Sequence, residues 1–395
     1  GSPAGTSITL TWTSPGDDGI VGRARTYDIR YSTSTITEQN WDGASTAIGE
    51  PYPKVVGYEE TFTVGDLDPT TTYYFCIRAG DDANNWSDLS NVSSMTTLML
   101  GEWTLYNTGN SEIPNDTILA ICLDANKYFG SPAGLIELDG LDWSLIDVVG
   151  EDSTTNIVTD VAVDASGAVW VATQADGVTK IEGHFTTRIT DSTSGLTVNS
   201  IRSIVVNNDL DIWFGTGGGG ICLLTEGFLW TLYNTETSNL IFNGINKLVF
   251  DDAGSLWAAT NIGGVSKMVG DNFINYNSSD CPPLGTVWNM AFDDDGNGWF
   301  GTNGGVCKFD GSSWTYFNVS NSDLVSNVVT SIAFDAAGDL WFGTWDGLSR
   351  FDGSTWRNYT SQNSALPDNY IRALVADAGG NIWIGTNGGV AVFHD

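Results

Sequence analysis

Basic residues are scarce in this 395-residue chain: 15 lysines and arginines stand against 48 aspartates and glutamates, which gives a formal net charge of −33 at pH 7. A surface of this sign repels the phosphate backbone of nucleic acid, so we exclude nucleic acid as a partner. Long apolar runs are also missing. Because no stretch approaches the ~20 apolar residues that a membrane-spanning helix needs, we expect no insertion into a membrane.

Cysteine and histidine are equally rare. The five cysteines show no paired spacing: Cys281 falls in a loop, and the other four fall inside apparent strands, where a small buried side chain is the ordinary interpretation. We therefore expect neither a disulfide framework nor a zinc site. The two histidines, His184 and His394, are predicted in a turn and at a strand end, away from the funnel described below, which disfavours histidine-based acid–base catalysis.

Glycine and aromatic residues, by contrast, are abundant: the chain has 47 glycines, 16 tryptophans and 12% aromatic residues overall. This mixture favours many short strands joined by tight turns, and the predicted fold class is all-β. The segments 7–12, 27–31 and 73–79 alternate apolar and polar residues with period two, as half-buried strands do. Turn-rich stretches separate them, as in a β-sandwich.

The N-terminal region resembles the fibronectin type III family. The resemblance rests on Trp12 in the second predicted strand and on residues 67–73, Leu-Asp-Pro-Thr-Thr-Thr-Tyr, which look like the tyrosine corner of that family. It covers the whole region and implies that residues 1–98 form a fibronectin type III β-sandwich.

From residue 101 onward the sequence repeats itself about every 42 residues, and each unit contains four short apolar segments, the content of one propeller blade. The clearest copy runs from Asn327 to Tyr359. An aromatic residue in the second segment recurs seven times, at Phe129, Trp170, Trp213, Trp257, Trp299, Trp341 and Trp383. We therefore predict a seven-bladed β-propeller in residues 99–395.

The last unit has only three such segments before Asp395, and residues 102–107 match the missing fourth. We predict that the propeller closes by pairing of this first strand with the last blade, which leaves no free sheet edge. The repeats resemble the two-component-regulator propeller family, whose hallmark Asp-x-x-Gly-x-Leu/Ile-Trp-x-Gly-Thr is matched at residues 335–344 and 377–386. That resemblance implies an extracytoplasmic, ligand-sensing role in bacteria, often for oligosaccharides.

A binding site is expected on one face of this propeller. The loops after the second and fourth strands of every blade open on the same face. They include the long polar connections 107–116, 190–199 and 360–369, and binding surfaces usually belong to long loops on a rigid frame. The innermost strand of each blade begins at this face. Within its apolar frame one position differs from blade to blade: Leu119, Thr159, Arg202, Asn246, Trp288, Thr330 and Arg372.

The position that follows also varies, and together the two positions place Arg202, Lys247 and Arg372 in a central funnel. Guanidinium groups form paired hydrogen bonds to carboxylate or sulfate, and an indole such as that of Trp288 offers a flat face to a sugar ring. The alternative is that the basic side chains pair with Asp160 and with loop carboxylates inside the channel. The candidate ligand-binding residues are Arg202, Asn246, Lys247, Trp288, Asn289, Thr330, Trp345 and Arg372.

Trp345 is a candidate because Trp345-Asp346 interrupts an Asn-Gly-Gly turn that other repeats keep. Its ring either projects onto the binding face or is a plain surface tryptophan. The second-strand aromatic residues are too regular for a sugar ladder and indicate packing between blades. Four basic residues share one third-strand position, where a structural role is expected: Lys180, Lys267, Lys308 and Arg350.

No cofactor is predicted, and calcium is a weak alternative at two places. Residues 293–297 look like the start of a calcium loop, but they occupy the ordinary Asp-x-x-Gly turn and lack the later glutamate. Asp17-Asp18 and Asp81-Asp82 lie in sandwich loops that meet at one pole in the fibronectin type III family, where a solvated acidic rim is the simpler interpretation.

These features predict a secreted bacterial protein, extracellular or periplasmic and monomeric, that binds a carbohydrate on the long-loop face. An anionic oligosaccharide matches the funnel best, and another small polar ligand or a protein surface stays open as a partner. Two other functions are kept: a structural or adhesive extracellular module, and a propeller-type polysaccharide lyase or hydrolase acting through a Tyr/Arg or paired-carboxylate mechanism that includes Asp160.

Overall fold

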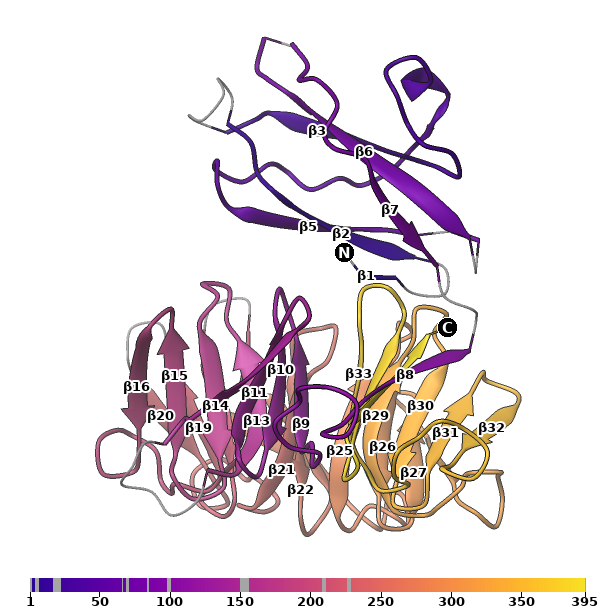
Figure 1. The fold of residues 1–395 in the computed structure, drawn as a ribbon. Coiled ribbons are helices and arrows are strands. Elements are labelled where there is room, and N and C mark those ends of the chain that lie inside the picture. Colours follow the sequence, from indigo (N-terminus) through magenta and orange to yellow (C-terminus); the bar gives the residue numbers. More distant parts are fainter. Residues whose placement is uncertain are drawn as a thin grey trace. The chain divides into compact units, whose positions relative to one another are not determined.

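The computed structural model describes the whole chain except residues 1, 4–6, 17–22, 66, 69–70, 84, 98–100, 150–155, 208–210, 226–228 and 395. It divides into two compact units, one built on Gly1–Trp103 and the other on Thr104–Ala376 and Ile382–Val392 (Figure 1). Apart from one 3₁₀ turn, the regular elements of the described residues are strands, as the all-β prediction requires. No helix in this part of the chain is long and apolar enough to cross a membrane.

The first unit is a sandwich of two antiparallel sheets, with strand orders β1-β2-β5 and β4-β3-β6-β7. Its elements are β1 (Ser2–Pro3), β2 (Ile8–Thr13), β3 (Thr26–Ser32), η1 (Trp41–Gly43), β4 (Ser45–Thr46), β5 (Glu59–Val64), β6 (Thr72–Gly80) and β7 (Ser93–Thr96).

Alternating side chains of β2, β3 and β6 form the core of the sandwich, as the period-two pattern predicts. Trp12 lies in β2 and meets the ring of Tyr27 edge-on at 5.3 Å. The hydroxyl of Tyr73 accepts a hydrogen bond from the backbone N–H of Asp68 at 3.0 Å, which confirms the predicted tyrosine corner. Residues 69–70 of that corner lie outside the described part of the chain.

Within the described residues, seven four-stranded sheets belong wholly or largely to the second unit, and we number them 1 to 7 along the chain. Sheet 1 contains β9 (Ala120–Leu123), β10 (Lys127–Ser131), β11 (Gly134–Asp139) and β12 (Asp142–Ile146), and sheet 2 contains β13 (Val158–Val163), β14 (Val169–Thr173), β15 (Val178–Glu182) and β16 (Phe185–Ile189). Sheet 3 contains β17 (Ile201–Val206), β18 (Ile212–Thr216), β19 (Ile221–Leu224) and β20 (Trp230–Tyr233), sheet 4 contains β21 (Ile245–Phe250), β22 (Leu256–Thr260), β23 (Val265–Val269) and β24 (Asn272–Tyr276), and sheet 5 contains β25 (Val287–Phe292), β26 (Gly298–Thr302), β27 (Gly305–Phe309) and β28 (Trp314–Phe317). Sheet 6 contains β29 (Val329–Phe334), β30 (Leu340–Thr344), β31 (Leu348–Phe351) and β32 (Trp356–Tyr359), and sheet 7 contains β33 (Ile371–Ala376), β34 (Ile382–Thr386), β35 (Val390–His394) and β8 (Glu102–Tyr106).

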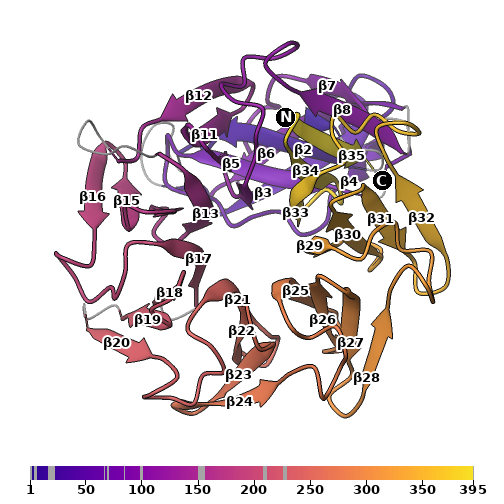
Figure 2. The ribbon, with the colours of Figure 1, turned by 90° about the horizontal axis from the view of Figure 1, so that it is seen from below.

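These sheets have a propeller-like arrangement. Figure 2 shows β13, β17, β21, β25, β29 and β33 nearest the centre, and β16, β20, β24, β28 and β32 at the periphery. In sheets 1 to 6 the strands follow one another in chain order, whereas in sheet 7 the strand next to β35 is β8, which comes from the other end of the unit. This is the order expected if residues 102–107 complete the last repeat.

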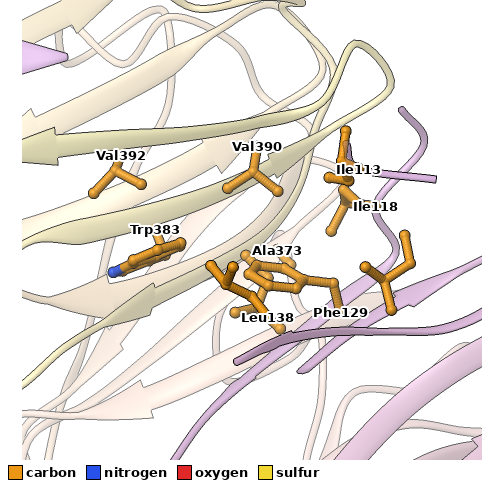
Figure 3. Close-up of a cluster of buried hydrophobic side chains, with 10 residues drawn as sticks. Ile113, Ile118, Phe129, Leu138, Ala373, Trp383, Val390 and Val392 are labelled. Carbon is orange, nitrogen blue, oxygen red and sulfur yellow. The ribbon is translucent and has the colours of Figure 1, made fainter. Parts of the chain in front are cut away.

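Apolar packing between neighbouring sheets forms the core of this unit. All seven aromatic residues of the second strands are buried: Phe129, Trp170, Trp213, Trp257, Trp299, Trp341 and Trp383. Sheets 1 and 7 share one cluster in which Ile118 and Phe129 meet Trp383 and Val390 (Figure 3). The prediction that these aromatic residues pack between sheets rather than form a sugar ladder is confirmed, and burial of each contributes roughly 1.5–3 kcal/mol or more.

Polar and charged side chains hold four of these tryptophans in place. In four sheets the indole N–H donates to the aspartate that ends the inner strand, over 2.8–3.0 Å, in the pairs Trp170–Asp164, Trp257–Asp251, Trp299–Asp293 and Trp341–Asp335. The third-strand basic residues Lys180, Lys267, Lys308 and Arg350 lie over the same four rings at 4.9–5.1 Å, which supports their structural role. Burial raises the pKa of Asp251, but hydrogen bonds from Trp257 and Lys267 outweigh it and leave that pKa below its usual value.

The expectation of no disulfide was wrong, because Cys281 and Cys307 are joined. Cys307 lies in β27, and Cys281 lies in the connection between sheets 4 and 5, where its N–H donates to the carbonyl of Asn277. At this place in other connections the residue is serine, whose hydroxyl donates to the same carbonyl: Ser111, Ser194, Ser238, Ser322 and Ser364. The partner is brought close by the stacking of strands, which spacing alone does not show, but the one cysteine in a column of serines was a usable sign.

Candidate functional site

The inner strands of sheets 2 to 7 share one irregularity near their first residue. In β13, for example, Val158 pairs with Thr173 and Asp160 pairs with Ala172, so Thr159 is an extra residue, as in a β-bulge. A bulge leaves a residue outside the ladder and re-aims its side chain. The six residues in this position are Thr159, Arg202, Asn246, Trp288, Thr330 and Arg372. The position that varies most in the sequence is therefore the bulge.

Two cavities meet at these bulges. One has a volume of about 820 Å³ and the other about 300 Å³. The residues that line both are Leu119, Thr159, Arg202, Asn246, Trp288, Thr330 and Arg372, and we call these seven the collar. The larger, outer cavity is also lined by residues that follow second strands, among them Asn303 and Trp345, so it opens on the predicted face. The smaller, inner cavity reaches Asp160, Lys247 and Asn289.

All eight sequence-predicted site residues thus line one or both cavities, but their partners differ. Lys247 of sheet 4 forms an ion pair with Asp160 of sheet 2 at 2.8 Å. The same carboxylate oxygen accepts the backbone N–H of Ile204 at 3.0 Å, and Asp160 is 5% exposed. For Lys247 the alternative interpretation, pairing inside the channel, is the one the structure supports, because its charge is already compensated.

The two arginines of the collar are placed differently. Arg202 donates from Nη1 to the amide oxygen of Asn246 at 2.9 Å, and Arg372 donates from Nε to the amide oxygen of Asn387 at 2.7 Å. The guanidinium of Arg372 also lies 4.6 Å from the ring centre of Tyr370. Throughout the described residues, no carboxylate lies within ion-pair distance of either guanidinium. Neutral amides therefore orient these two charges without cancelling them.

Aromatic side chains complete the outer cavity. Trp288 donates from Nε1 to the amide oxygen of Asn303 at 2.7 Å, which fixes its ring at the collar. Trp345 is 43% exposed and stacks on Tyr370 with ring centres 5.4 Å apart. Sequence reasoning missed Tyr370. The available sign was that Tyr370 stands two residues before a collar position, where no other inner strand of sheets 2 to 7 carries an aromatic residue.

Neither histidine lines these cavities. His184 is exposed in the turn between β15 and β16. His394 is buried at the end of β35, hydrogen-bonded through Nδ1 to Asn381 at 2.7 Å, and burial lowers its pKa.

The calcium candidates are partly engaged by other groups. The carboxylate of Asp293 accepts hydrogen bonds from Asn297 and Trp299, and that of Asp81 accepts two from Asn85. Asp17-Asp18 lies outside the described residues. Across the described part of the chain, no three histidine, cysteine, aspartate or glutamate side chains are grouped as metal ligands would be.

Comparison with known families supports both resemblances. Residues 2–95 match the fibronectin type III domain, and residues 323–346 and 365–388 match the two component regulator propeller. A curated relative, calcium-activated chloride channel regulator 1 of Mus musculus, is 34% identical over 98 residues, which are 22% of this chain and 10% of that protein. The chain therefore spans about a tenth of that relative's length.

Solved structures share the fold. The extracellular domain of a putative hybrid two component system from B. thetaiotaomicron is 18% identical with a TM-score of 0.66, over 88% of this chain and 49% of that one. Virginiamycin B lyase from Staphylococcus aureus is 13% identical with a TM-score of 0.60, over 74% of this chain and 98% of that one. At such identities the likeness concerns the fold alone, and the chain spans about half of that extracellular domain.

Proposed function

We propose that this chain is a bacterial ligand-recognition protein that binds an acidic oligosaccharide in the outer cavity. The observation that carries the proposal is the pair Arg202 and Arg372, which bring two uncompensated positive charges to one cavity of a protein with a net charge of −33. A carboxylate or sulfate fits a guanidinium through paired hydrogen bonds. Trp288 and Trp345 add flat apolar surface for sugar rings at the same cavity.

The frame proposed for this site is a closed propeller of seven blades, one for each sheet. Closure is supported by the place of β8 beside β35 and by the hydrogen bond from the Ile118 N–H to the Thr386 carbonyl, which joins sheets 1 and 7. A closed ring holds its inner strands rigidly, and rigid walls lower the ordering cost of binding. We propose the chain as a monomer.

An extracellular or periplasmic location agrees with two observations. The Cys281–Cys307 disulfide is of a kind that persists in oxidising compartments. The similar structure from B. thetaiotaomicron is described as an extracellular domain. The acidic surface leaves nucleic acid outside the proposed partners.

The test is binding to an array of acidic and neutral oligosaccharides, followed by isothermal titration. We expect binding to uronate-containing or sulfated members, weakened roughly tenfold or more in Arg372→Ala, because a hydrogen bond to a charged group contributes about 1.5–3 kcal/mol. Arg357→Ala is the matched control, since Arg357 is exposed on β32 and the change in net charge is the same. If acidic and neutral glycans behave alike, the proposal is overturned.

Catalysis is the competing outcome, because the fold also occurs in lyases. A polysaccharide lyase acting on a polyuronate would release unsaturated product, which absorbs in the ultraviolet. We expect no such absorbance, because neither histidine lines the cavities and Asp160 is held by Lys247. Turnover of a polyuronate would replace the proposed binding function with an enzymatic one.

A further inference from the structure

The collar residues of sheets 2 to 7 fall into two alternating sets. Those of sheets 2, 4 and 6 use their side chains to bind the backbone of the following sheet. The bonds run from Thr159 Oγ1 to the Ile201 carbonyl (2.6 Å), from Asn246 Nδ2 to the Val287 carbonyl (2.8 Å) and from Thr330 Oγ1 to the Ile371 carbonyl (2.6 Å). We call Thr159, Asn246 and Thr330 the braces.

Each brace acts at a defined point. The three accepting carbonyls belong to the residues immediately before Arg202, Trp288 and Arg372, which are the collar residues of sheets 3, 5 and 7. A buried backbone carbonyl needs a hydrogen-bond partner, and the brace supplies one from the neighbouring sheet, next to the bulge. Each brace therefore fixes the peptide that carries the next collar side chain.

The collar residues of sheets 3, 5 and 7 donate to side chains and not to the backbone of the following sheet. Arg202, Trp288 and Arg372, which we call the arms, each donate to the amide oxygen of an asparagine: Asn246, Asn303 and Asn387. Each arm is thus held twice, by a brace on its backbone and by an amide on its side chain. Such a double hold is the arrangement that a preorganised recognition site requires.

Two of the three arms are charged and the third is aromatic, and this chemistry defines what they can hold. Arg202 and Arg372 come from different sheets and line the same cavity, with the indole of Trp288 between them in chain order. Lys247 does not add to this charge because Asp160 compensates it. A volume of about 820 Å³ lies within the range of about 300–1,000 Å³ typical of ligand pockets, so one ligand can reach all three arms.

We propose that Arg202, Trp288 and Arg372 form a single three-point site for a ligand that carries two anionic groups on a ring-containing frame, and that Thr159, Asn246 and Thr330 are its positioning residues. This inference rests on the proposed function and adds to it a requirement for two charges. A carboxylate or sulfate on each guanidinium, with a sugar ring against the indole, uses every arm. A ligand with one anionic group leaves one arginine unused.

The test compares matched probes by isothermal titration: galacturonic acid with digalacturonic acid, and singly with doubly sulfated lactose. In at least one pair, we expect the second charge to tighten binding roughly tenfold or more. Arg202→Ala and Arg372→Ala should each bring the affinity for the doubly charged probe down to that for the singly charged one. In the double variant the fold-loss of affinity for the doubly charged probe should be smaller than the product of the fold-losses in the two single variants. The reason is that one remaining arginine already gains little from the second anion.

The outcomes separate this inference from the proposed function. Equal affinity for one and two charges in both pairs, or loss of binding in only one arginine variant, overturns the three-point site while acidic glycan binding stands. No binding by any acidic probe, on the array or in titration, overturns both.

The braces are tested by Thr330→Val and Thr330→Ser. Valine keeps the shape of threonine but lacks the hydroxyl that bonds Ile371, whereas serine keeps it. We expect Thr330→Val to reduce the preference for two charges at least threefold and Thr330→Ser to restore it. The exposed Thr315, changed to valine, is the control. A lower melting temperature with an unchanged preference would mean that Thr330 only stabilises the fold.

Discussion

Two columns of residues run through sheets 2 to 7, one in the second strands and one at the bulges of the inner strands, and they behave in opposite ways. The second-strand column is tryptophan in every one of these sheets, and each ring is buried. At the bulge, by contrast, no two neighbouring sheets carry the same residue, and these side chains are only half buried. A residue that must pack against the same neighbour in every repeat has no freedom to vary, whereas a residue that faces the cavity has.

The comparison also explains why a basic side chain is structural at one position and available for a ligand at another. Lys267 lies over Trp257 and pairs with Asp251 at 3.0 Å, so its charge belongs to the packing of its own sheet. Arg372 has an asparagine and a tyrosine ring as its neighbours instead. The repeated basic residues stabilise the frame, and the unrepeated arginines remain available for a ligand.

The largest effect is expected for two tryptophans four residues apart, Trp341 in β30 of sheet 6 and Trp345 just after that strand. Trp341 is fully buried and donates to Asp335, whereas Trp345 is 43% exposed at the outer cavity. Trp341→Ala should lower the free energy of unfolding by about 3–5 kcal/mol, because it leaves a large cavity in the core. Trp345→Ala should lower it by only about 1 kcal/mol, because it removes the stack on Tyr370 but leaves no cavity in the core.

Denaturant titration measures the stability of both tryptophan variants, and isothermal titration with an acidic glycan measures their binding. We expect Trp345→Ala to weaken binding while most of the stability is kept. Equal losses of stability in the two variants would show that Trp345 belongs to the packing of the sheets and not to the cavity.

A second test uses the place where one repeat departs from the others. Cys281→Ser removes the disulfide but installs the residue that the other connections carry, so the local turn is kept. Because the two cysteines are 26 positions apart in the sequence, loss of the cross-link should cost about 2–4 kcal/mol of stability. Denaturant titration checks this, with the reduced natural chain as its control. If reduction destabilises the natural chain but Cys281→Ser does not, the serine contact and not the cross-link sets the stability here.

Sequence alone predicted the frame well because the repeat shows each packing position several times. The second-strand tryptophans and the strand of residues 102–107 were recognised in this way, whereas the tyrosine corner at Tyr73 was recognised from the resemblance to the fibronectin type III family. The candidate site was only partly predictable. The variable column identified Arg202 and Arg372, and pairing of the basic side chains with Asp160 was kept as the alternative. The pattern did not show which of the three makes this pair, nor that Tyr370 stacks on Trp345. Contacts between repeats depend on the spatial offset of neighbouring sheets, which a pattern within one repeat does not contain.

The smallest expected effect comes from sheet 3, where asparagine replaces the aspartate that binds the tryptophan. There, among the buried polar atoms of the described residues, Trp213 Nε1 has no hydrogen-bond partner. Asn207 donates from Nδ2 to the carboxylate of Asp211 at 3.4 Å, so Asn207→Asp alone would place two carboxylates side by side. The double variant Asn207→Asp/Asp211→Asn reproduces the pair Asp293–Asn297 of sheet 5, in which the aspartate accepts from the tryptophan, and should stabilise the chain by about 1 kcal/mol. The gain should be smaller than in sheet 4 because Leu223 stands where that sheet has Lys267.

The pH dependence of this gain distinguishes a new charge-assisted bond from better packing. In the folded chain the pKa of such a carboxyl lies below its usual value, as it does for Asp251. Its contribution is therefore complete above about pH 4 and is lost as the pH falls through the folded-state pKa. Melting temperatures at pH 7 and pH 3 measure this, and Asp251→Asn is the reverse control, which should be destabilised at pH 7 and closer to the natural chain at pH 3. A gain from Asn207→Asp/Asp211→Asn that persists unchanged at pH 3, or a loss at pH 7, would contradict the role assigned to the aspartates that bind the tryptophans.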